Sequence, residues 1–252
     1  MTLAHVAAPL SSIIIPTYNR CELLRHCVSS IRKYTDVPYE IIVVDNHSSD
    51  GTRHYCIAER LTYVSLPENR GFPAACNAGM LISSGDTIVL LNNDVVVSHY
   101  WLRNLSQALM EHEEVGIVGP TTNYASGRQQ VNHPYEDLEQ FHRLAAQLNQ
   151  PDRFKRERVQ RVVGLCFALK RKVLDTIGLL DEQFNPGHYE DDDFCLRARM
   201  SGYGIMMCGD VFVHHYGSHS FKQLGETHLR QLVQRNYELF KRKWNIDPHH
   251  FM

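Results

Sequence analysis

The sequence has no C-x-x-C pair, and its seven cysteines are an odd number. We therefore expect neither a cysteine-based zinc site nor a complete disulfide framework, and free thiols in a reducing compartment fit better. No apolar run approaches the roughly 20 residues that a membrane-spanning helix needs. The first eight residues carry no Lys or Arg, so a secretory signal is not expected either. These absences predict a cytoplasmic protein.

The chain also lacks an excess of positive charge. It has 26 Lys and Arg against 28 Asp and Glu, which gives a net charge of −2. A general nucleic-acid partner is therefore not expected, because such binders gather Lys and Arg in excess. With 252 residues, 43% of them hydrophobic, the chain has the composition of a globular protein with an ample core.

Short β-branched runs alternate with helical patterns in the first half of the chain. The expected strands are 12–15, 40–44, 61–65, 87–91 and 115–118, and the expected helices are 20–34, 50–60, 72–84 and 98–112. The strands are apolar without strict alternation, as in a sheet covered on both faces. Strand-helix-strand repetition implies parallel pairing. The predicted fold class is therefore α/β, with a Rossmann-like, mostly parallel sheet flanked by helices.

The alternation of strand and helix patterns ends after residue 120. Residues 121–160 contain one expected helix at 137–149 in an otherwise irregular stretch, which is more often a functional cover than a connector. Further strands are expected at 162–168 and 211–213, and further helices at 192–201 and 225–244. We expect one domain spanning 1–252.

Polar clusters follow four successive strands of the first half. They are Pro16–Asn19, Asp45–Thr52, Asn69–Phe72 and Asn92–Asp94. Ligands of open α/β sheets bind at the carboxyl ends of the strands, so these clusters predict a binding site. Any single cluster could instead reflect the turn preference of Asn, Asp and Gly. Neither G-x-G-x-x-G nor G-x-x-x-x-G-K-[ST] is present, so we expect a nucleotide to be held by acidic and amide side chains and a metal.

These motifs, together with Tyr189-Glu190-Asp191-Asp192-Asp193-x3-Arg197, resemble in their order the motif series of inverting family 2 glycosyltransferases. The bacterial rhamnosyltransferase-like branch is the most similar, and the resemblance runs from about residue 11 to 220. It implies the GT-A fold, with a nucleotide-binding half at about 11–120 and an acceptor-side, catalytic half at about 121–252. It further implies transfer of a sugar from a nucleoside-diphosphate sugar, with inversion at the anomeric carbon.

The resemblance assigns the donor pocket to the strand ends. Pro16, Thr17 and Asn19 would line the base and ribose pocket, and Asp45 would accept a hydrogen bond from the imide N–H of a pyrimidine. A UDP- or dTDP-sugar is therefore the expected donor, since uracil and thymine offer that donor group. The ribose and diphosphate would lie near Asn69, Arg70 and Gly71. Asn77 would either continue that wall or face solvent.

Asn92, Asn93 and Asp94 occupy the position of the family's Asp-x-Asp motif. By resemblance, Asp94 binds a divalent metal, Mn²⁺ or Mg²⁺, that bridges the donor diphosphate, since hard ions take oxygen ligands. Position 92 is Asn instead of Asp, so metal affinity should be lower, and Asn92 would bond the ribose or reach the metal through water. The late segment resembles the family's His-x4-Ser pattern, with His215 paired to Ser220 and His215 as a further metal ligand.

The acidic run Glu190–Asp193 contains the residues that the resemblance implies for catalysis. The resemblance aligns Glu190 and Asp191 with the family's acidic pair and makes Asp191 the base that takes the proton of the acceptor hydroxyl. Four consecutive acids leave the register open by one residue. The alternative is a solvated helix start, where carboxylates complement the helix dipole.

Two basic stretches have two interpretations each. Arg153–Arg161 would be an exposed helix face or a lid that contacts phosphate. Lys241–Trp244 would be a solvated helix end or a peripheral contact with an anionic membrane surface. The expected acceptor is a surface glycan or its lipid-linked precursor. Rival functions are a sugar nucleotidyltransferase and a non-catalytic nucleotide-sugar sensor.

Overall fold

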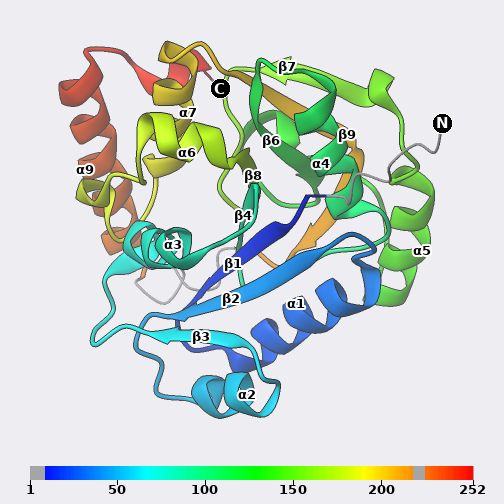
Figure 1. Ribbon diagram of the computed structural model, residues 1–252. Coiled ribbons are helices and arrows are strands. Elements are labelled where there is room, and N and C mark those ends of the chain that lie inside the picture. The colour runs from blue at the N-terminus through cyan, green and yellow to red at the C-terminus, as the bar shows by residue number, and fades with distance from the viewer. Residues whose placement is uncertain (1–8, 218–224, 252) are drawn as a thin grey trace.

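A computed structural model describes residues 9–217 and 225–251 (Figure 1). The strands are β1 (Ser11–Thr17), β2 (Tyr39–Asp45), β3 (Thr62–Ser65), β4 (Thr87–Leu91), β5 (Val95–Val96), β6 (Val115–Thr122), β7 (Arg156–Val159), β8 (Cys166–Lys170) and β9 (Gly204–His215). The helices are α1 (Cys21–Tyr34), α2 (Thr52–Ala58), α3 (Gly71–Ile82), α4 (Trp101–Glu111), α5 (Leu138–Leu148), α6 (Arg171–Ile177), α7 (Glu190–Met200) and α9 (Glu226–Trp244). Four short 3₁₀ segments complete the elements, η1 (Gly127–Gln129), η2 (Arg153–Lys155), η3 (Glu182–Phe184) and η4 (Pro248–Phe251).

A central sheet joins the two halves of the chain. Its strand order is β3-β2-β1-β4-β8-β6-β9-β5, and β7 adds to β9. The strands β1 to β4 are mutually parallel, as the sequence predicts. The junction between the halves differs, because β8 runs antiparallel to both β4 and β6. The mostly parallel sheet flanked by helices is confirmed. The parallel pairing predicted from strand-helix repetition in the first half holds for β1 to β4, whereas β6 pairs antiparallel with β8.

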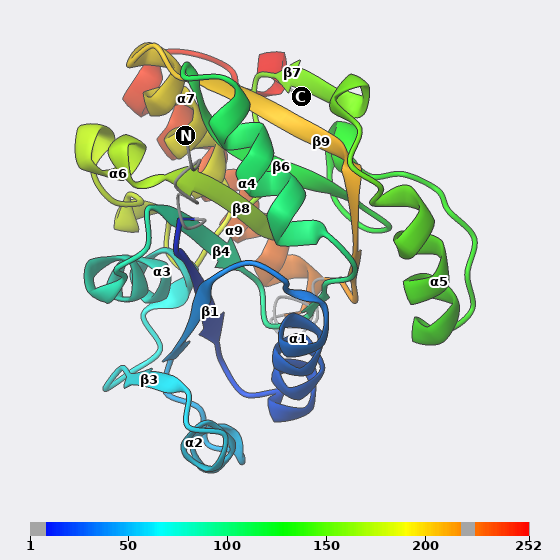
Figure 2. The same ribbon diagram turned by 45° about the vertical axis from the view of Figure 1, so that its right-hand side comes forward.

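Both faces of the sheet are covered, which explains why its strands read as continuous apolar runs. Ile13 and Ile15 pack with α1 and α4 on one face, whereas Ile14 packs with α3, α6 and α7 on the other. Adjacent strand residues point to opposite faces, so both sets must be apolar. Figure 2 shows α5 on the outer side of the molecule beside β9, where Phe141 and Phe212 form a smaller core.

Several boundaries in the second half differ from the expected ones. The strand expected at 162–168 begins only at Cys166, and the strand expected at 211–213 extends over the whole of β9. The helix expected at 192–201 begins two residues earlier, at Glu190. Its first turn therefore includes all four acids, which complement the helix dipole.

The basic stretch Arg153–Arg161 contributes β7 to the sheet and is not an exposed helix face, while its predicted contact with phosphate stays a prediction. The stretch forms η2 and then β7, which pairs with β9. Arg156 is buried and makes an ion pair with the fully buried Asp210 at 2.8 Å. A buried carboxylate needs such a partner, so this arginine holds β7 to the sheet.

The basic segment Lys241–Trp244 at the end of α9 also makes internal contacts. Lys243 contacts Asp193 at 2.6 Å and Asp181 at 2.7 Å, and Trp244 donates its indole N–H to Asp193 at 2.8 Å. These side chains therefore tie α9 to α7, which neither interpretation of the segment anticipated. Among the described residues, no helix is long and apolar enough to cross a membrane.

Candidate active site

A cleft of about 690 Å³ lies at the carboxyl ends of β1 and β4 and is closed on the other side by α7. The strand ends contribute Pro16, Thr17, Asn92, Asn93 and Asp94. The loop before α3 contributes Asn69 and Gly71, and the α7 side contributes Glu190, Asp191 and Asp192. Further lining comes from Tyr18, Asn46, Phe72, Ser126, Arg161, Val163, Gly164, Leu165, Pro186, His188, Tyr189, His215 and Val233. The cleft therefore brings together residues from both halves of the chain.

Hydrogen bonds between strand ends hold the donor side of the cleft. The side-chain amide of Asn93 donates to Thr17 Oγ1 at 2.8 Å and joins the ends of β4 and β1. Asn46 accepts from the Arg70 backbone N–H at 2.8 Å and donates to the Gly71 carbonyl at 2.9 Å. The sequence motif that contains Asn46 predicts no role for it. In the structure it fixes the loop that leads into α3.

Asp45 and Asn19 do not line the cleft. Asp45 is buried and accepts from the Tyr63 hydroxyl at 2.5 Å and from the Ser48 backbone N–H at 2.9 Å. Asn19 has a φ of 55° and accepts from the Ser49 backbone N–H at 2.9 Å. Both side chains therefore hold the loops after β1 and β2 in place. Their predicted contacts with a base stay predictions.

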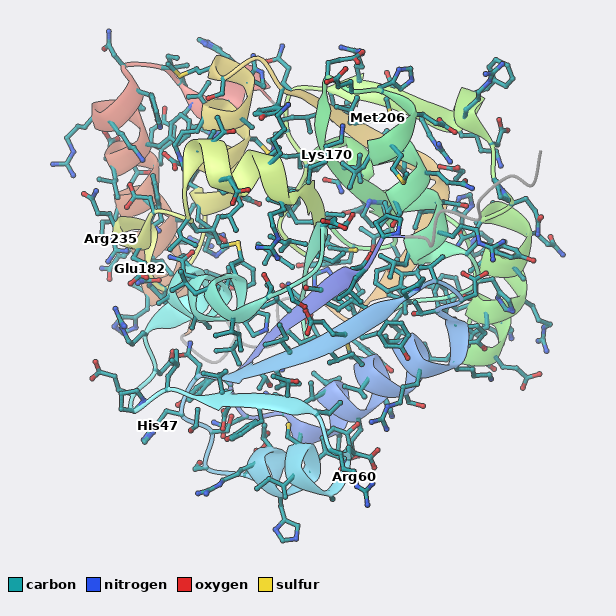
Figure 3. The ribbon with its side chains drawn as sticks, in the orientation of Figure 1. His47, Arg60, Lys170, Glu182, Met206 and Arg235 are labelled. Carbon is teal, nitrogen blue, oxygen red and sulfur yellow. The ribbon has the colours of Figure 1, made fainter. Side chains whose placement is uncertain are left out.

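Arg70 lies outside the cleft as well. Its guanidinium contacts Glu182 of η3 at 2.9 Å, and Figure 3 labels Glu182 on the side of the molecule that carries α3 and α9. Asn77 donates to the same carboxylate at 3.0 Å and to the Leu180 carbonyl at 2.9 Å. Asn77 is therefore neither a cleft wall nor a solvent-facing residue, because it joins α3 to the segment before η3.

Gly71 has a specific steric reason to be glycine. Its φ is +84°, and a Cβ there would lie 2.6 Å from the Cα of Pro186. The neighbouring Phe72 N–H donates to the Pro186 carbonyl at 2.9 Å. The start of α3 therefore packs directly against the loop that leads to α7, as only glycine allows.

Asp94 and His215 come together where β5 pairs with β9. His215 Nε2 lies 3.2 Å from Asp94 Oδ1, and both residues are buried. The other ring nitrogen, Nδ1, is 2.8 Å from the Tyr124 carbonyl, which can only accept. The proton of a neutral ring is thus on Nδ1, so the lone pair of Nε2 faces the carboxylate. Burial lowers the pKa of His215, but Asp94 outweighs it and the net pKa is raised.

This arrangement fits a divalent cation. Nε2 of His215 and Oδ1 of Asn92 are buried without a hydrogen-bond partner in the described part of the molecule. When the ring is neutral, a cation between Asp94 and His215 would bind the two lone pairs that face each other. No group of three His, Cys, Asp or Glu side chains forms a metal cluster among the described residues. Other ligands would then be water and phosphate oxygens, which Mg²⁺ and Mn²⁺ sites commonly use. Ser220, the predicted partner of His215, lies outside the described residues.

Two acidic side chains of α7 have carboxyl oxygens that could take part in a reaction. Asp191 lines the cleft and accepts backbone N–H groups from Gly164 at 2.9 Å and Asp192 at 3.0 Å, which fix its orientation. Glu190 is buried, and its Oε2 has no hydrogen-bond partner among the described residues. Burial, and then the charge of Asp191, raises the pKa of Glu190 well above its usual range.

The next two acids have internal partners. Asp192 pairs with Arg161 at 2.9 Å, and burial together with Asp191 raises the pKa of Asp192 to about 7. Asp193 is fully buried and accepts from Arg197 at 2.9 Å as well as from Trp244. Asp193 therefore serves the packing of α7.

Sequence reasoning missed several cleft residues. The sequence marks Arg161 only as part of a basic stretch and Gly164 as part of a strand, whereas both residues line the cleft. The motif that contains Phe72 predicts no role for it, and no sequence pattern singles out His188, yet both line the cleft. Their positions depend on the loops before α3, β8 and α7, for which sequence periodicity gives no signal.

Comparisons with known proteins identify the family. The family described as "Glycosyl transferase family 2" matches residues 12–178. The glycosyltransferase AglE of Haloferax volcanii is 26% identical over 88% of this chain and 71% of its own length. The uncharacterized protein y4gI of Sinorhizobium fredii is 29% identical over 94% of this chain, which spans only 28% of that protein.

Solved structures support the fold. A mannosyltransferase of Pyrobaculum calidifontis, PcManGT, in complex with GDP-Man and Mn²⁺, superposes with a TM-score of 0.63 at 22% identity, over 86% of this chain and 61% of that one. GalNAc-T7 with UDP, GalNAc and Mn²⁺ gives 0.67 at 16% identity, over 82% and 43%. These neighbours have the GT-A fold, which confirms the predicted fold.

The family match covers the strand ends that build the donor side of the cleft. The acidic side is built by α7, which follows the matched residues. On this basis, the chain belongs to glycosyl transferase family 2.

Proposed function

We propose that this protein transfers a sugar from a nucleoside-diphosphate sugar to an acceptor hydroxyl, with a divalent metal and with inversion. The observation that carries the proposal is the facing pair of Asp94 Oδ1 and His215 Nε2, 3.2 Å apart in a cleft that also holds Asp191. In the neighbouring structures the named ligands are a GDP-sugar or UDP, with Mn²⁺.

Charge supports the need for a metal. The described cleft lining carries four carboxylates and one arginine, and that arginine is paired with Asp192. A diphosphate is itself anionic and would be repelled by such a cleft. With a cation held by Asp94 and His215, the site could accept the diphosphate. Such an ion also stabilises the charge that develops on a departing diphosphate.

Asp191 is the proposed base. Its carboxylate lines the cleft on the α7 side, across from the strand ends that would hold the donor. Each oxygen accepts one backbone N–H and keeps a lone pair. One base suffices for an inverting transfer, because the acceptor hydroxyl attacks the anomeric carbon opposite the leaving diphosphate and gives its proton to the base. The diphosphate leaves as an anion and needs no acid.

The donor proposed is a UDP- or dTDP-sugar, and the acceptor is a glycan or a lipid-linked precursor. The donor part rests on Asp45 as acceptor of the pyrimidine imide N–H. Asp45 is engaged by Tyr63 and Ser48 in the structure, so a base would have to share this carboxylate.

A screen of nucleotide sugars tests the proposal. Thermal unfolding is measured with UDP-, dTDP- and GDP-sugars, with and without Mn²⁺, because a ligand that binds only the folded state raises the melting temperature. Any donor that stabilises the protein is then assayed for release of nucleoside diphosphate. The anomeric configuration of the product is read by NMR. Release of pyrophosphate from a nucleoside triphosphate supplied together with a sugar 1-phosphate would instead point to a nucleotidyltransferase, and binding without turnover would point to a sensor.

A further inference from the structure

The strand β9 ends at His215, where its two edges are held in different ways. On the β5 side, backbone pairing continues past the end of the strand, since the Tyr216 N–H donates to the Asp94 carbonyl at 3.0 Å. On the β6 side, the last backbone pair joins Val213 to Thr122, which is also the last residue of β6. The β6 backbone therefore stops pairing two residues before His215.

The side chain of Asn123 takes over from the β6 backbone. Its Oδ1 accepts from the His215 backbone N–H at 2.8 Å, and its Nδ2 donates to the His215 carbonyl at 3.1 Å. The Thr122 hydroxyl donates to the same Oδ1 at 3.3 Å and helps to orient the amide. An asparagine amide carries a donor and an acceptor side by side. One side chain thus satisfies both backbone polar groups of His215.

The next residue of the same loop holds the ring of His215. The Tyr124 carbonyl lies 2.8 Å from Nδ1, and the Tyr124 ring packs edge-on against the imidazole, with the ring centroids 5.8 Å apart. Because Asn123 and Tyr124 are consecutive, the anchoring of Asn123 to the His215 backbone also sets where the Tyr124 carbonyl lies. The backbone and the ring of His215 are therefore held by one dipeptide of the loop after β6.

Asn123 is not among the residues that line the cleft. Its amide is engaged inside the protein, so it would act on a bound metal through His215 and without touching the ion. Residues that orient a metal-ligating histidine typically affect metal affinity nearly as much as the ligands do. A backbone anchor has the same consequence here, because Nε2 must stay close to Asp94 Oδ1, 3.2 Å away, for both atoms to reach one ion.

We propose that Asn123 is a positioning residue for the metal site: its amide extends the β6 edge of the sheet and holds His215 with Nε2 facing Asp94. The inference rests on the proposed function, since it takes Asp94 and His215 as the metal ligands. The competing explanation is that Asn123 only closes the sheet edge and contributes to the stability of the fold.

The first test measures Mn²⁺ affinity by isothermal titration calorimetry, in the presence of the nucleoside diphosphate selected by the screen. Asn123→Ala should weaken Mn²⁺ binding about ten- to hundredfold, the usual effect of losing a residue that orients a metal ligand. Gln130→Ala is the matched control from the same loop. Gln130 is exposed, and its Oε1 accepts from the Ala125 backbone N–H at 3.2 Å. Its loss should change the affinity by less than about twofold, as expected for an independent site.

A double-mutant cycle separates positioning from a general effect on the fold. His215→Gln removes the ligand through which Asn123 is proposed to act. Adding Asn123→Ala to His215→Gln should therefore weaken Mn²⁺ binding by no more than about twofold further. If Asn123 affected the metal by another route, the two losses would multiply.

The second test needs neither metal nor nucleotide. The imidazole of His215 is observed by ¹H–¹⁵N NMR in protein labelled with ¹⁵N-histidine, and its signals are assigned by their loss in His215→Gln. At alkaline pH, where the ring is neutral, the wild type should show one tautomer with the proton on Nδ1, so its two nitrogens should differ clearly in chemical shift. In Asn123→Ala the two shifts should move toward each other, because the ring is no longer held to the Tyr124 carbonyl. Gln130→Ala should keep the wild-type pattern. If Asn123→Ala does not fold, Asn123→Ser takes its place in both tests.

Three results would overturn the inference and leave the proposed function standing. They are a wild-type Mn²⁺ affinity in Asn123→Ala, losses that multiply in the double variant, and a wild-type pattern of ring nitrogen shifts in Asn123→Ala. A wild-type protein that binds no Mn²⁺ would instead refute the proposed metal role of Asp94 and His215, and the inference with it.

Discussion

Asp94 and His215 lie far apart in the sequence, yet the pairing of β5 with β9 places Oδ1 of one 3.2 Å from Nε2 of the other. The Tyr124 carbonyl orients the ring through Nδ1, so Nε2 is directed at the carboxylate. Backbone pairing therefore fixes the spacing of the two candidate metal ligands, and one hydrogen bond fixes the ring. This leads to a first prediction about metal binding.

Asp94→Asn and His215→Gln should each weaken Mn²⁺ binding at least about tenfold in the presence of nucleoside diphosphate, because each removes a ligand. Isothermal titration calorimetry measures the affinity. Asn92→Asp should tighten binding, since it places a negative charge where the unpartnered buried Oδ1 of Asn92 now lies. His249→Gln is the control, because His249 is exposed on η4. No detectable Mn²⁺ binding by the wild type would remove the metal role of both residues.

Asp191→Asn should lower the rate of transfer by about 10²–10⁴-fold, the usual effect of losing a general base. Its affinity for nucleotide should stay close to that of wild type, because the strand ends would hold the donor. Single-turnover rates and calorimetry separate the two quantities.

Asp192→Asn is not a neutral control for that experiment, although it neighbours Asp191 in the acidic run. Asp192 is buried and paired with Arg161, so its loss leaves a buried cation unpaired. Asp175→Asn, at an exposed position of α6, is the better control. If Asp191→Asn retains full activity, the base lies elsewhere.

Asp45→Asn should weaken UDP binding by about 1.5–3 kcal/mol if the carboxylate accepts the imide N–H, since hydrogen bonds to charged groups have this strength. Tyr63→Phe is the matched variant, because it removes the internal partner of Asp45 and leaves the carboxylate. It should keep UDP affinity within about threefold. Equal stabilisation of the wild type by GDP and UDP would contradict a pyrimidine-specific role.

Gly71→Ala should destabilise the protein by about 1–3 kcal/mol more than Gly178→Ala. Both glycines have positive φ, +84° and +76°, so both substitutions strain the backbone. A Cβ at 71 would also meet Pro186 at 2.6 Å, whereas one at 178 has nothing within 4 Å. Urea denaturation of the two variants isolates the steric part. Equal losses would mean that the loop before α7 moves away at little cost.

His142 should make stability depend on pH. Burial, with Lys33 and His99, lowers the pKa of His142 to about 4 from an ordinary 6.5. The unfolded chain therefore binds a proton at a higher pH than the folded one, and stability should fall as the pH drops from about 6.5 to 4. The side chain is partly exposed, so the loss should be on the order of 1 kcal/mol. His142→Gln should flatten this part of the pH curve measured by urea denaturation.

Much of the architecture follows from sequence alone. The apolar runs at 40–44 and 87–91 lie within or coincide with β2 and β4, because strands buried on both faces must be apolar along their length. The motifs at the strand ends also predict a cleft built by Thr17, Asn69 and Asn92, because parallel strands end at one edge of a sheet.

Tertiary structure decided the rest. The sequence marks Asp45 and Arg70 as polar residues at strand ends, but only packing shows that they face Tyr63 and Glu182. Glu190 to Asp193 are all acidic, so their residue types do not distinguish them. Four adjacent residues of a helix nevertheless point in different directions. Which acid reaches the cleft, which meets Arg161 and which is fixed by Arg197 and Trp244 depends on the segments packed around α7. Those contacts come from residues distant in the chain, so no local pattern encodes them.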